Sequence, residues 1–279
     1  MSLCCPARQE ERRGRQCPPM LGRPRVRSKT LLLAALVCCG AFAAFAGAAT
    51  QSVAGCDPSI RYCTPGVLPA GVYTTRYFLP GMRLAVPAGD WWSGEDSAVE
   101  FKIAPPGSST TPPAIVFWID PQADTTCTDR RLPVDMTTPA RAVRWLRSNE
   151  NVIVSATRHT TIAGHLPALS VDLDVSPSAP RCDPSCPGPC IEYFLFFGKG
   201  HLHPSPDLAP GHTEGAIEGF GTGRGEPTRL YFAEIGKPSH LLLVAVDTLN
   251  RKSFATLTAS ATKLLATLRL PTRLPPKRH

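Results

Sequence analysis

"TRLYFAEIGKPSHLLLVAVD", residues 228–247, contains two runs of β-branched, aromatic and aliphatic residues separated by Gly-Lys-Pro-Ser. Such runs on either side of a Gly- and Pro-containing turn predict a β-hairpin. The next segment, residues 251–269, has apolar side chains at helical spacing and predicts an amphipathic helix that closes the domain. The apolar face of this helix comprises Phe254, Leu257, Ala261, Leu264, Leu265 and Leu268.

The segments before this hairpin also favour strands. Thr138-Pro139 predicts the start of a short helix over residues 139–149. The order of elements predicts an α+β fold, in which a short central helix and a long C-terminal helix pack on an antiparallel β-sheet. Strands are expected at residues 72–78, 83–86, 99–104, 114–119 and 191–197, with a further hairpin at 157–163 and 169–175.

Residues 1–48 predict an N-terminal arm and a secretory signal peptide. A basic stretch precedes the uncharged run from Leu31 to Ala49, and Ala46-Gly47-Ala48 fits a small-residue cleavage site. An uncleaved signal anchor is the alternative, because the run is just long enough to span a bilayer. The start codon is either Met1 or Met20. The mature chain is expected to comprise a Cys-containing segment at 49–66, a single α+β domain at 67–270 and a disordered tail at 271–279.

The charge of the chain argues against nucleic-acid binding. The full sequence has 30 Lys and Arg against 22 Asp and Glu. Eight of the basic residues and two of the acidic ones lie in the first 48 residues, so the mature chain has a net charge of only +2. The excess of positive charge therefore belongs to the targeting segment and predicts no nucleic-acid partner.

Six cysteines remain after the leader, and an even number in an exported chain favours disulfide bonds. Val53-Ala54-Gly55-Cys56 also has the form of a lipobox, which would attach lipid to Cys56. Lipidation would leave one cysteine without a partner, so a bridge from Cys56 to Cys63 is preferred over the lipid. The six cysteines are Cys56, Cys63, Cys127, Cys182, Cys186 and Cys190.

The spacing of the last three cysteines permits two interpretations. With His201 and His203, a C-x3-C-x3-C pattern could supply zinc ligands. A Pro- and Gly-rich loop held by disulfides is favoured, since thiols oxidise outside the cell. In that interpretation one of the three pairs with Cys127 and the other two pair with each other.

Trp91 and Trp92 lie in "PAGDWWSGED", which is expected to form a loop. Exposed loop aromatics are typical of binding surfaces, where they stack on a sugar ring or dock on a partner protein. The alternative is a loop that folds back so that the tryptophans cap the edge of the sheet. Trp91 and Trp92 are the candidate ligand-binding residues.

Catalytic signals are weak. The sequence has no nucleophile elbow, no metalloprotease helix motif and no P-loop. His201, His203 and His212, with Glu214 nearby, could bind a transition metal, although a solvated loop is the simpler interpretation. Asp172 and Asp174 could form a carboxylate pair for acid–base chemistry, but the exposed face of a half-buried strand is preferred. "GFGTGRGEP", residues 219–227, is expected to be a flexible approach to the last hairpin.

Several of these segments together carry a family resemblance. "LPAGVYTTRYFLPGMRLAVPAGDWW", "TPARAVRWLRSN", "IAGHLPALSVDLDV" and "RLYFAEIGKPSHLLLVAVD" with "FATLTASATKLLATLRL" resemble exported bacterial proteins that lack an assigned activity. The final module is similar to PsbP-like and LpqN-type lipoprotein domains. The resemblance implies an α/β/α sandwich and export, and it carries over no catalytic residue.

The sequence therefore predicts an exported, disulfide-stabilised and non-catalytic domain at the cell envelope or outside the cell. It is expected to bind an envelope protein or a small ligand, to need no cofactor, and to contact the membrane only through a signal anchor or a lipid at Cys56. The alternative is an exported metal-dependent hydrolase that uses His201, His203 and His212.

Overall fold

The computed structural model describes residues 51–52, 56–57, 62–63, 66–107, 113–124, 132–182, 188–197 and 216–274. By its contacts the chain divides between Gly47 and Ala48, and the unit from Ala48 onward contains all of the elements described below.

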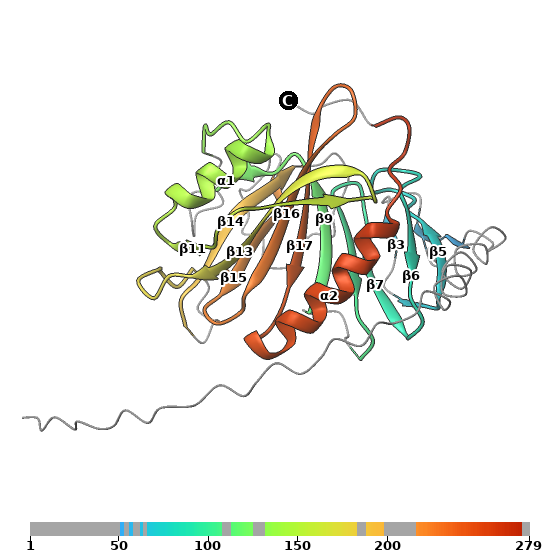
Figure 1. The fold of residues 1–279 in the computed structure, drawn as a ribbon, viewed down its shortest axis with the longest axis horizontal. Helices are drawn as coiled ribbons and strands as arrows, with labels where there is room; N and C mark the ends of the chain where they lie inside the picture. Colours follow the sequence, from blue (N-terminus) through green and yellow to red (C-terminus); the bar gives the residue numbers. More distant parts are fainter. Residues whose placement is uncertain are drawn as a thin grey trace, which may run out of the picture. The chain divides into compact units, whose positions relative to one another are not determined.

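The centre of the fold is one large, antiparallel sheet (Figure 1). The main path of the sheet runs β11 (Val152–Val154), β13 (Leu166–Val175), β16 (Thr228–Ile235), β17 (His240–Asp247), β9 (Ala114–Ile119), β8 (Glu100–Ala104), β7 (Trp91–Asp96), β3 (Tyr62–Cys63) and β2 (Cys56–Asp57). Outside this path, β12 (Arg158–Ile162) pairs with β13, and β4 (Gly66–Leu68) pairs with β7.

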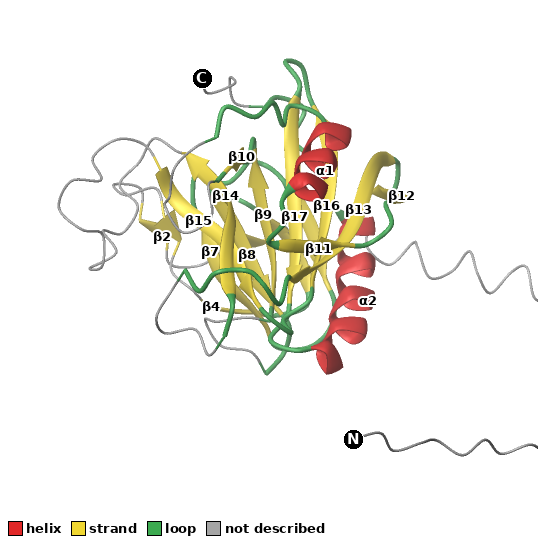
Figure 2. Cartoon of the chain, turned by 90° about the vertical axis from the view of Figure 1, so that its left-hand side faces the viewer, coloured by secondary structure: helices red, strands yellow, loops and turns green. Residues whose placement is uncertain are grey.

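Two smaller sheets accompany the large one. The first contains β1 (Gln51–Ser52), β5 (Gly71–Thr74) and β6 (Arg83–Val86), and its β1–β5 pair is parallel. The second contains β10 (Gln122–Ala123), β14 (Cys190–Phe197) and β15 (Ala216–Gly223). The two helices of the described residues, α1 (Pro139–Ser148) and α2 (Arg251–Thr267), are also drawn in Figure 2.

The two central strands of the large sheet are covered on both faces. Every residue of β17 except Asp247, and every residue of β9 except Ile119, is buried. A strand that contacts water on one face alternates apolar and polar residues, whereas a strand covered on both faces reads as a continuous apolar run. This double burial explains why "HLLLVAVD" and "AIVFWI" show so little alternation.

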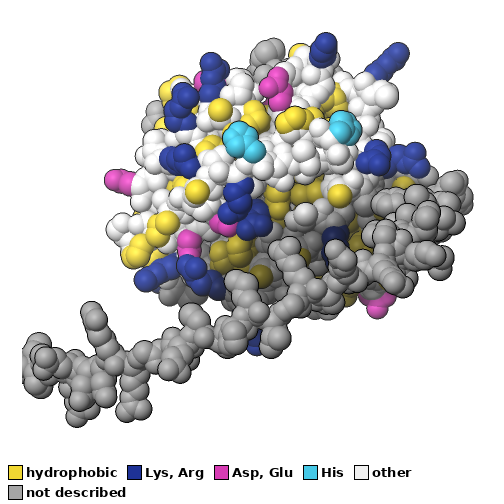
Figure 3. Space-filling model, viewed as in Figure 1, with side chains coloured by type: hydrophobic (Ala, Val, Ile, Leu, Met, Phe, Trp, Pro, Cys, Tyr) yellow, Lys and Arg dark blue, Asp and Glu magenta, His cyan; other side chains and the backbone are white. Residues whose placement is uncertain are grey.

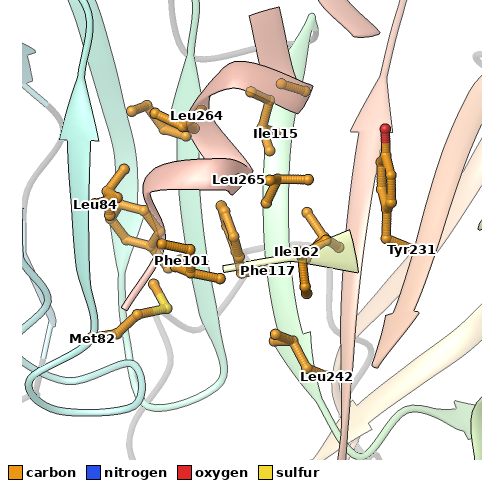
Figure 4. Close-up of a cluster of buried hydrophobic side chains, with 14 of the residues drawn as sticks. Met82, Leu84, Phe101, Ile115, Phe117, Ile162, Tyr231, Leu242, Leu264 and Leu265 are labelled. Atoms are coloured by element: carbon orange, nitrogen blue, oxygen red, sulfur yellow. The ribbon is translucent and has the colours of Figure 1, made fainter. Parts of the chain in front are cut away.

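Helix α2 and the β5–β6 pair cover one face of the large sheet. Their apolar side chains meet alternate residues of the central strands, including Phe117 and Leu242. Figure 4 shows Leu264 and Leu265 of α2 pointing toward this layer. Burial of such a layer is the dominant favourable contribution to folding.

Helix α1 and the second small sheet cover the opposite face. Trp118 of β9 stacks on Phe196 of β14, with ring centroids 4.6 Å apart and planes 7° from parallel. Trp145 of α1 contacts Phe194 of the same strand. The second core therefore contains a cluster of aromatic rings among its aliphatic side chains, and β14 forms its outer wall.

Both helices begin as the sequence predicts. The Thr138 hydroxyl accepts a hydrogen bond from the backbone N–H of Arg141, and Pro139 occupies the first turn. Asn250 caps α2 in the same way through Ser253 N–H. Side-chain oxygens at these positions satisfy backbone donors that the first helical turn leaves without partners. Within the part of the chain that the structure describes, no helix has the length and apolar character needed to cross a membrane.

The predicted α+β fold class is wrong, because the protein is mostly antiparallel β-sheet. The residue segments expected to be helices are helices, but strands also supply a large part of each covering layer. A sandwich with a single sheet would require the segment "IEYFLFF" to join the main sheet, but it does not. It pairs with β10 and β15 and packs over the main sheet as a second sheet.

Two segments expected to be loops are strands. Residues 91–96 form β7, and the glycine-rich residues up to Gly223 belong to β15. Gly221 lies where β14 approaches most closely, since a Cβ atom there would be 1.9 Å from the carbonyl oxygen of Ile191. Glycine at this position therefore permits strand pairing rather than loop flexibility.

A buried carboxylate connects the two layers near β7. Asp96 is fully buried, and its side chain accepts hydrogen bonds from the backbone N–H groups of Arg76 (2.6 Å), Tyr77 (3.0 Å) and Phe78 (2.8 Å). Burial raises the pKa of Asp96, and the three hydrogen bonds oppose that shift. Asp96 thus fixes the bend that leads from β5 toward β6.

Candidate functional site

The two tryptophans proposed as ligand contacts lie on opposite faces of β7. Trp91 is only 3% exposed and belongs to the core beneath α2. Trp92 is partly exposed on the other face, directly opposite Val67 of β4 in the strand register. The expected exposed loop is therefore absent, and of the pair only Trp92 lies where a partner could reach its ring.

The proposed metal ligands His201, His203 and His212 lie outside the described residues, as does Glu214. Among the residues that are described, no group of three or more His, Cys, Asp or Glu side chains is arranged to hold a metal ion.

The cysteines are only partly covered by the structure. Cys56 lies directly opposite Cys63 in the antiparallel β2–β3 pair. Directly opposite residues in such pairs have Cα atoms about 4.5–5.5 Å apart, within the range that a disulfide spans. Cys127 and Cys186 lie outside the described residues.

Cys182 and Cys190 lie beside each other through a backbone hydrogen bond from Cys182 N–H to the Cys190 carbonyl, at 3.0 Å. Cys63, Cys182 and Cys190 are each disulfide-bonded, and none of the three is a free thiol.

The carboxylates of Asp172 and Asp174 do not form an acid–base pair. Asp172 accepts hydrogen bonds from Arg158 (2.6 Å) and from Arg229 (2.6 and 3.0 Å). These bonds and charges hold the pKa of Asp172 below its ordinary value, although burial opposes them. Asp174 pairs with Arg251. Both carboxylates therefore form ion pairs on the outer face of this half-buried strand, which is the interpretation preferred from the sequence.

The charges on the face that carries α2 are dispersed. Figure 3, in the same view as Figure 1, shows Lys and Arg side chains in several separate places, with acidic side chains between some of them. Asp172, for example, forms ion pairs with both Arg158 and Arg229.

A polar group at one end of the aromatic core was not predicted from the sequence. Asp247, the last residue of β17, lies near Tyr193 of β14 and accepts a hydrogen bond from the Thr228 hydroxyl at 3.2 Å. Burial raises the pKa of Asp247 to about 7, with a further contribution from the negative charge of Glu226. A carboxyl with this pKa can both accept and release a proton near neutral pH.

Tyr193 completes this polar group from the opposite layer. Its hydroxyl is fully buried beside the Thr228 hydroxyl. Burial raises the pKa of Tyr193 well above its ordinary value, and the charge of Asp247 raises it further. The tyrosine therefore stays protonated. Nothing in "VAVD" or "EYF" distinguishes these residues from ordinary ends of strands, so the sequence alone could not identify the group.

A second buried acid–base contact joins β9 and β17. His240 is 1% exposed, and its Nδ1 lies 2.7 Å from the Asp120 carboxylate, which also accepts the backbone N–H of Leu241. Asp120 has a left-handed backbone (φ 51°), which is uncommon for a residue other than glycine. The two contacts of Asp120 join the end of β9 to the start of β17, and the other ring nitrogen of His240, Nε2, is buried without a hydrogen-bond partner among the described residues.

Comparisons with known proteins identify no relative. No protein-family model, no curated protein and no solved structure matches the chain. None of them therefore identifies a PsbP-like or LpqN-type domain, and the geometry described above carries the functional argument alone.

Proposed function

We propose that this protein is an exported, disulfide-stabilised domain that binds a ligand or protein of the cell envelope and does not catalyse a reaction. The observation that carries the binding role is an apolar surface on the outer face of β4 and β7. Val67 is 56% exposed there and lies directly opposite Trp92. Scattered exposed apolar residues are ordinary, but an aromatic ring beside an exposed aliphatic side chain favours a contact surface.

The position of the folded unit supports export. The unit begins at Ala48, where the small-residue cleavage site ends. Residues Gln51 and Ser52 then pair with Tyr73 and Thr74 as β1. Cleavage near Ala48 would keep this strand, whereas cleavage at the lipobox before Cys56 would remove it. Retention of β1 and the register of Cys56 with Cys63 both favour a free, bridged N-terminus over a lipidated one.

An intact mass of the exported protein tests this processing. We expect a chain that starts near Ala49 and gains six alkyl groups only when reduction precedes alkylation, because all six remaining cysteines are bridged. The same protein alkylated without reduction is the control and should gain none. A chain that starts at Cys56 and carries the extra mass of a diacylglycerol would contradict the proposal.

Site-specific photo-crosslinking tests the binding surface. A photoreactive phenylalanine at Val67 is expected to give a crosslinked product with a cell-envelope preparation. Ile153 provides the matched control, since it is 55% exposed but lies on β11, at the far end of the strand order from β4. Trp92→Ala is expected to weaken the Val67 product, because it removes the aromatic ring that lies beside Val67 on this face.

Equal crosslinking from Val67 and Ile153 would show that the contact is non-specific and would contradict the binding surface. The unfolding midpoint of Trp92→Ala is measured as a control. Loss of the Val67 product with an unchanged midpoint shows that the ring is needed for contact and not for folding.

A further inference from the structure

β12 lies at one edge of the large sheet. Among the described strands it pairs with β13 alone, and Figure 2 shows it at the outer margin of the sheet. An edge strand presents backbone N–H and C=O groups on its outer side, and these groups can pair with another extended chain. The strand register determines which groups of β12 point outward.

Pro167 fixes the orientation of the β12 backbone. It lies directly opposite Thr161, and proline has no N–H to donate. Residues of an antiparallel pair alternate between hydrogen-bonded and non-hydrogen-bonded positions, so the N–H and C=O of Thr161 point away from β13. Two residues further along, the Ala163 N–H donates to the Leu265 carbonyl of α2 at 2.8 Å, which agrees with this orientation. His159, two residues before Thr161, also points outward.

The outward backbone groups of His159 and Thr161 are available for pairing. Within the part of the chain that the structure describes, no hydrogen bond reaches them on this side. Both side chains are exposed. Proline residues and β-bulges often protect an edge, but β12 contains no proline and its pairing with β13 has no register shift. The N–H and C=O groups of these two residues therefore form a short row to which a strand can be added.

The open edge is short because both of its ends are closed. At one end, the Arg147 side chain of α1 donates to the Ser155 carbonyl (3.3 Å) and to the Thr157 hydroxyl (2.8 Å). At the other end, the Ala163 N–H is bonded to α2, and the Arg269 side chain donates to the Ala163 carbonyl at 3.5 Å. An added strand is therefore confined to β12 and does not extend along β11.

Arginine side chains flank this edge. Arg147 and Arg269 are exposed, and neither forms an ion pair with a carboxylate of the described residues. Arg158 of β12 shares the Asp172 carboxylate with Arg229, so these three side chains together retain a positive charge. A partner strand with acidic residues at both ends complements these charges.

A second copy of β12 is a poorer partner. Antiparallel pairing of two copies about Thr160 would bring the end that carries Arg147 and Arg158 next to the end of the other copy that carries Arg269. Like charges that face each other across paired strands are destabilising.

We propose that the outer edge of β12 binds an extended, acidic segment of a partner protein, which joins the large sheet as an additional strand. Hydrogen bonds to the backbone of His159 and Thr161 supply the affinity, and the flanking arginines select acidic side chains. This edge lies at the far end of the strand order from β4 and β7, so the proposal does not depend on the Val67 surface.

Amide hydrogen exchange followed by NMR spectroscopy tests the pairing at single residues. The probe is a synthetic peptide of alternating Val and Thr with Glu residues at both ends, added to the whole protein. We expect the amides of His159 and Thr161 to exchange about tenfold more slowly with the peptide bound, because each gains an acceptor. The same peptide with Lys in place of Glu is the control and should bind at least about tenfold more weakly.

Thr161→Pro removes one outward donor. Proline is tolerated at an edge position whose N–H faces away from the sheet, so the unfolding midpoint should change little. We expect the affinity for the acidic peptide to fall about tenfold, whereas Thr161→Val keeps the N–H and should stay within about twofold. If Thr161→Pro does not fold, methylation of the backbone nitrogens of the peptide gives the same test on the unchanged protein.

Two results would overturn the proposal. One is equal binding of the acidic and the Lys-containing peptides, or no protection of His159 and Thr161 with the acidic peptide at about 1 mM. The other is protection that appears without peptide as the protein concentration rises, which would identify a second copy as the occupant. Crosslinking from Val67 is measured separately, so neither result is confused with failure of the Val67 surface.

Discussion

Replacing Asp96 with alanine is expected to lower the free energy of unfolding by about 3–5 kcal/mol. The carboxylate is fully buried and accepts three backbone N–H groups, of which that of Phe78 is buried and those of Arg76 and Tyr77 are partly buried. A buried donor that loses its acceptor costs about 1–3 kcal/mol, and partial relaxation of the bend keeps the total below the sum of three. Urea denaturation followed by circular dichroism measures the change.

Two further variants define this effect. Asp96→Asn keeps one acceptor oxygen but turns an amide NH2 toward backbone donors, so its loss should lie between that of alanine and zero. Asp90→Ala removes a carboxylate of similar position in the sequence that is exposed, and its change should stay within about 0.5 kcal/mol. If Asp96→Ala were as stable as Asp90→Ala, Asp96 would not hold the bend between β5 and β6.

The second large effect is expected at Trp118, the largest of the fully buried side chains. Trp118→Ala should lower the free energy of unfolding by about 3–5 kcal/mol, because it leaves a cavity between β9 and β14 and removes the stacking on Phe196. Chemical denaturation measures this loss, with an unchanged m-value showing that unfolding remains two-state.

Trp118→Phe is the matched control for ring chemistry. It keeps an aromatic ring against Phe196 and removes the indole N–H, which is buried and has no hydrogen-bond partner within the described residues. Removal of a buried donor without a partner offsets part of the lost contact area. We expect this variant to lose less than half as much stability as Trp118→Ala, and equal losses would show that the aromatic layer does not depend on ring packing.

The sequence alone predicts the strands and helices whose own residues favour that structure. The strands Arg83–Val86, Ala114–Ile119, Thr228–Ile235 and His240–Asp247 are confirmed residue for residue. Helix α1 is confirmed from its Thr138-Pro139 start. These segments combine strong β or helical composition with clear turn or capping residues, so tertiary contacts reinforce what the local sequence already favours.

The fold-class prediction was wrong because the structure of some segments depends on tertiary contacts and not on their local sequence. "WWSGED" carries glycine and acidic residues that are typical of loops, yet Asp96 forms buried hydrogen bonds and the segment pairs with β4 and β8. Glycines 219, 221 and 223 suggested flexibility, but close approach to β14 requires at least Gly221. Pairing partners distant in the sequence decided both cases, and a single sequence does not identify them.

The polar group around Asp247 and Tyr193 also could not be predicted from the sequence. Asp247 and Tyr193 lie on strands that are separated in the sequence by β15 and β16 and that belong to different sheets. Their proximity depends on how those sheets pack, and the raised pKa of Asp247 depends on burial that only the packing produces. The tryptophan pair was predicted from residue type alone, and the strand period then placed only one of the two rings toward the outside.

The central pairing of β9 with β17 has a consequence for the time at which the domain can form. Ile119 and Leu242 face each other in the middle of the sheet although they are far apart in the chain. The inner strands cannot close until the C-terminal hairpin has emerged from the ribosome, and pairings between distant segments form slowly. Until then β9 has no partner on its β17 side, and its apolar residues are not covered by that strand.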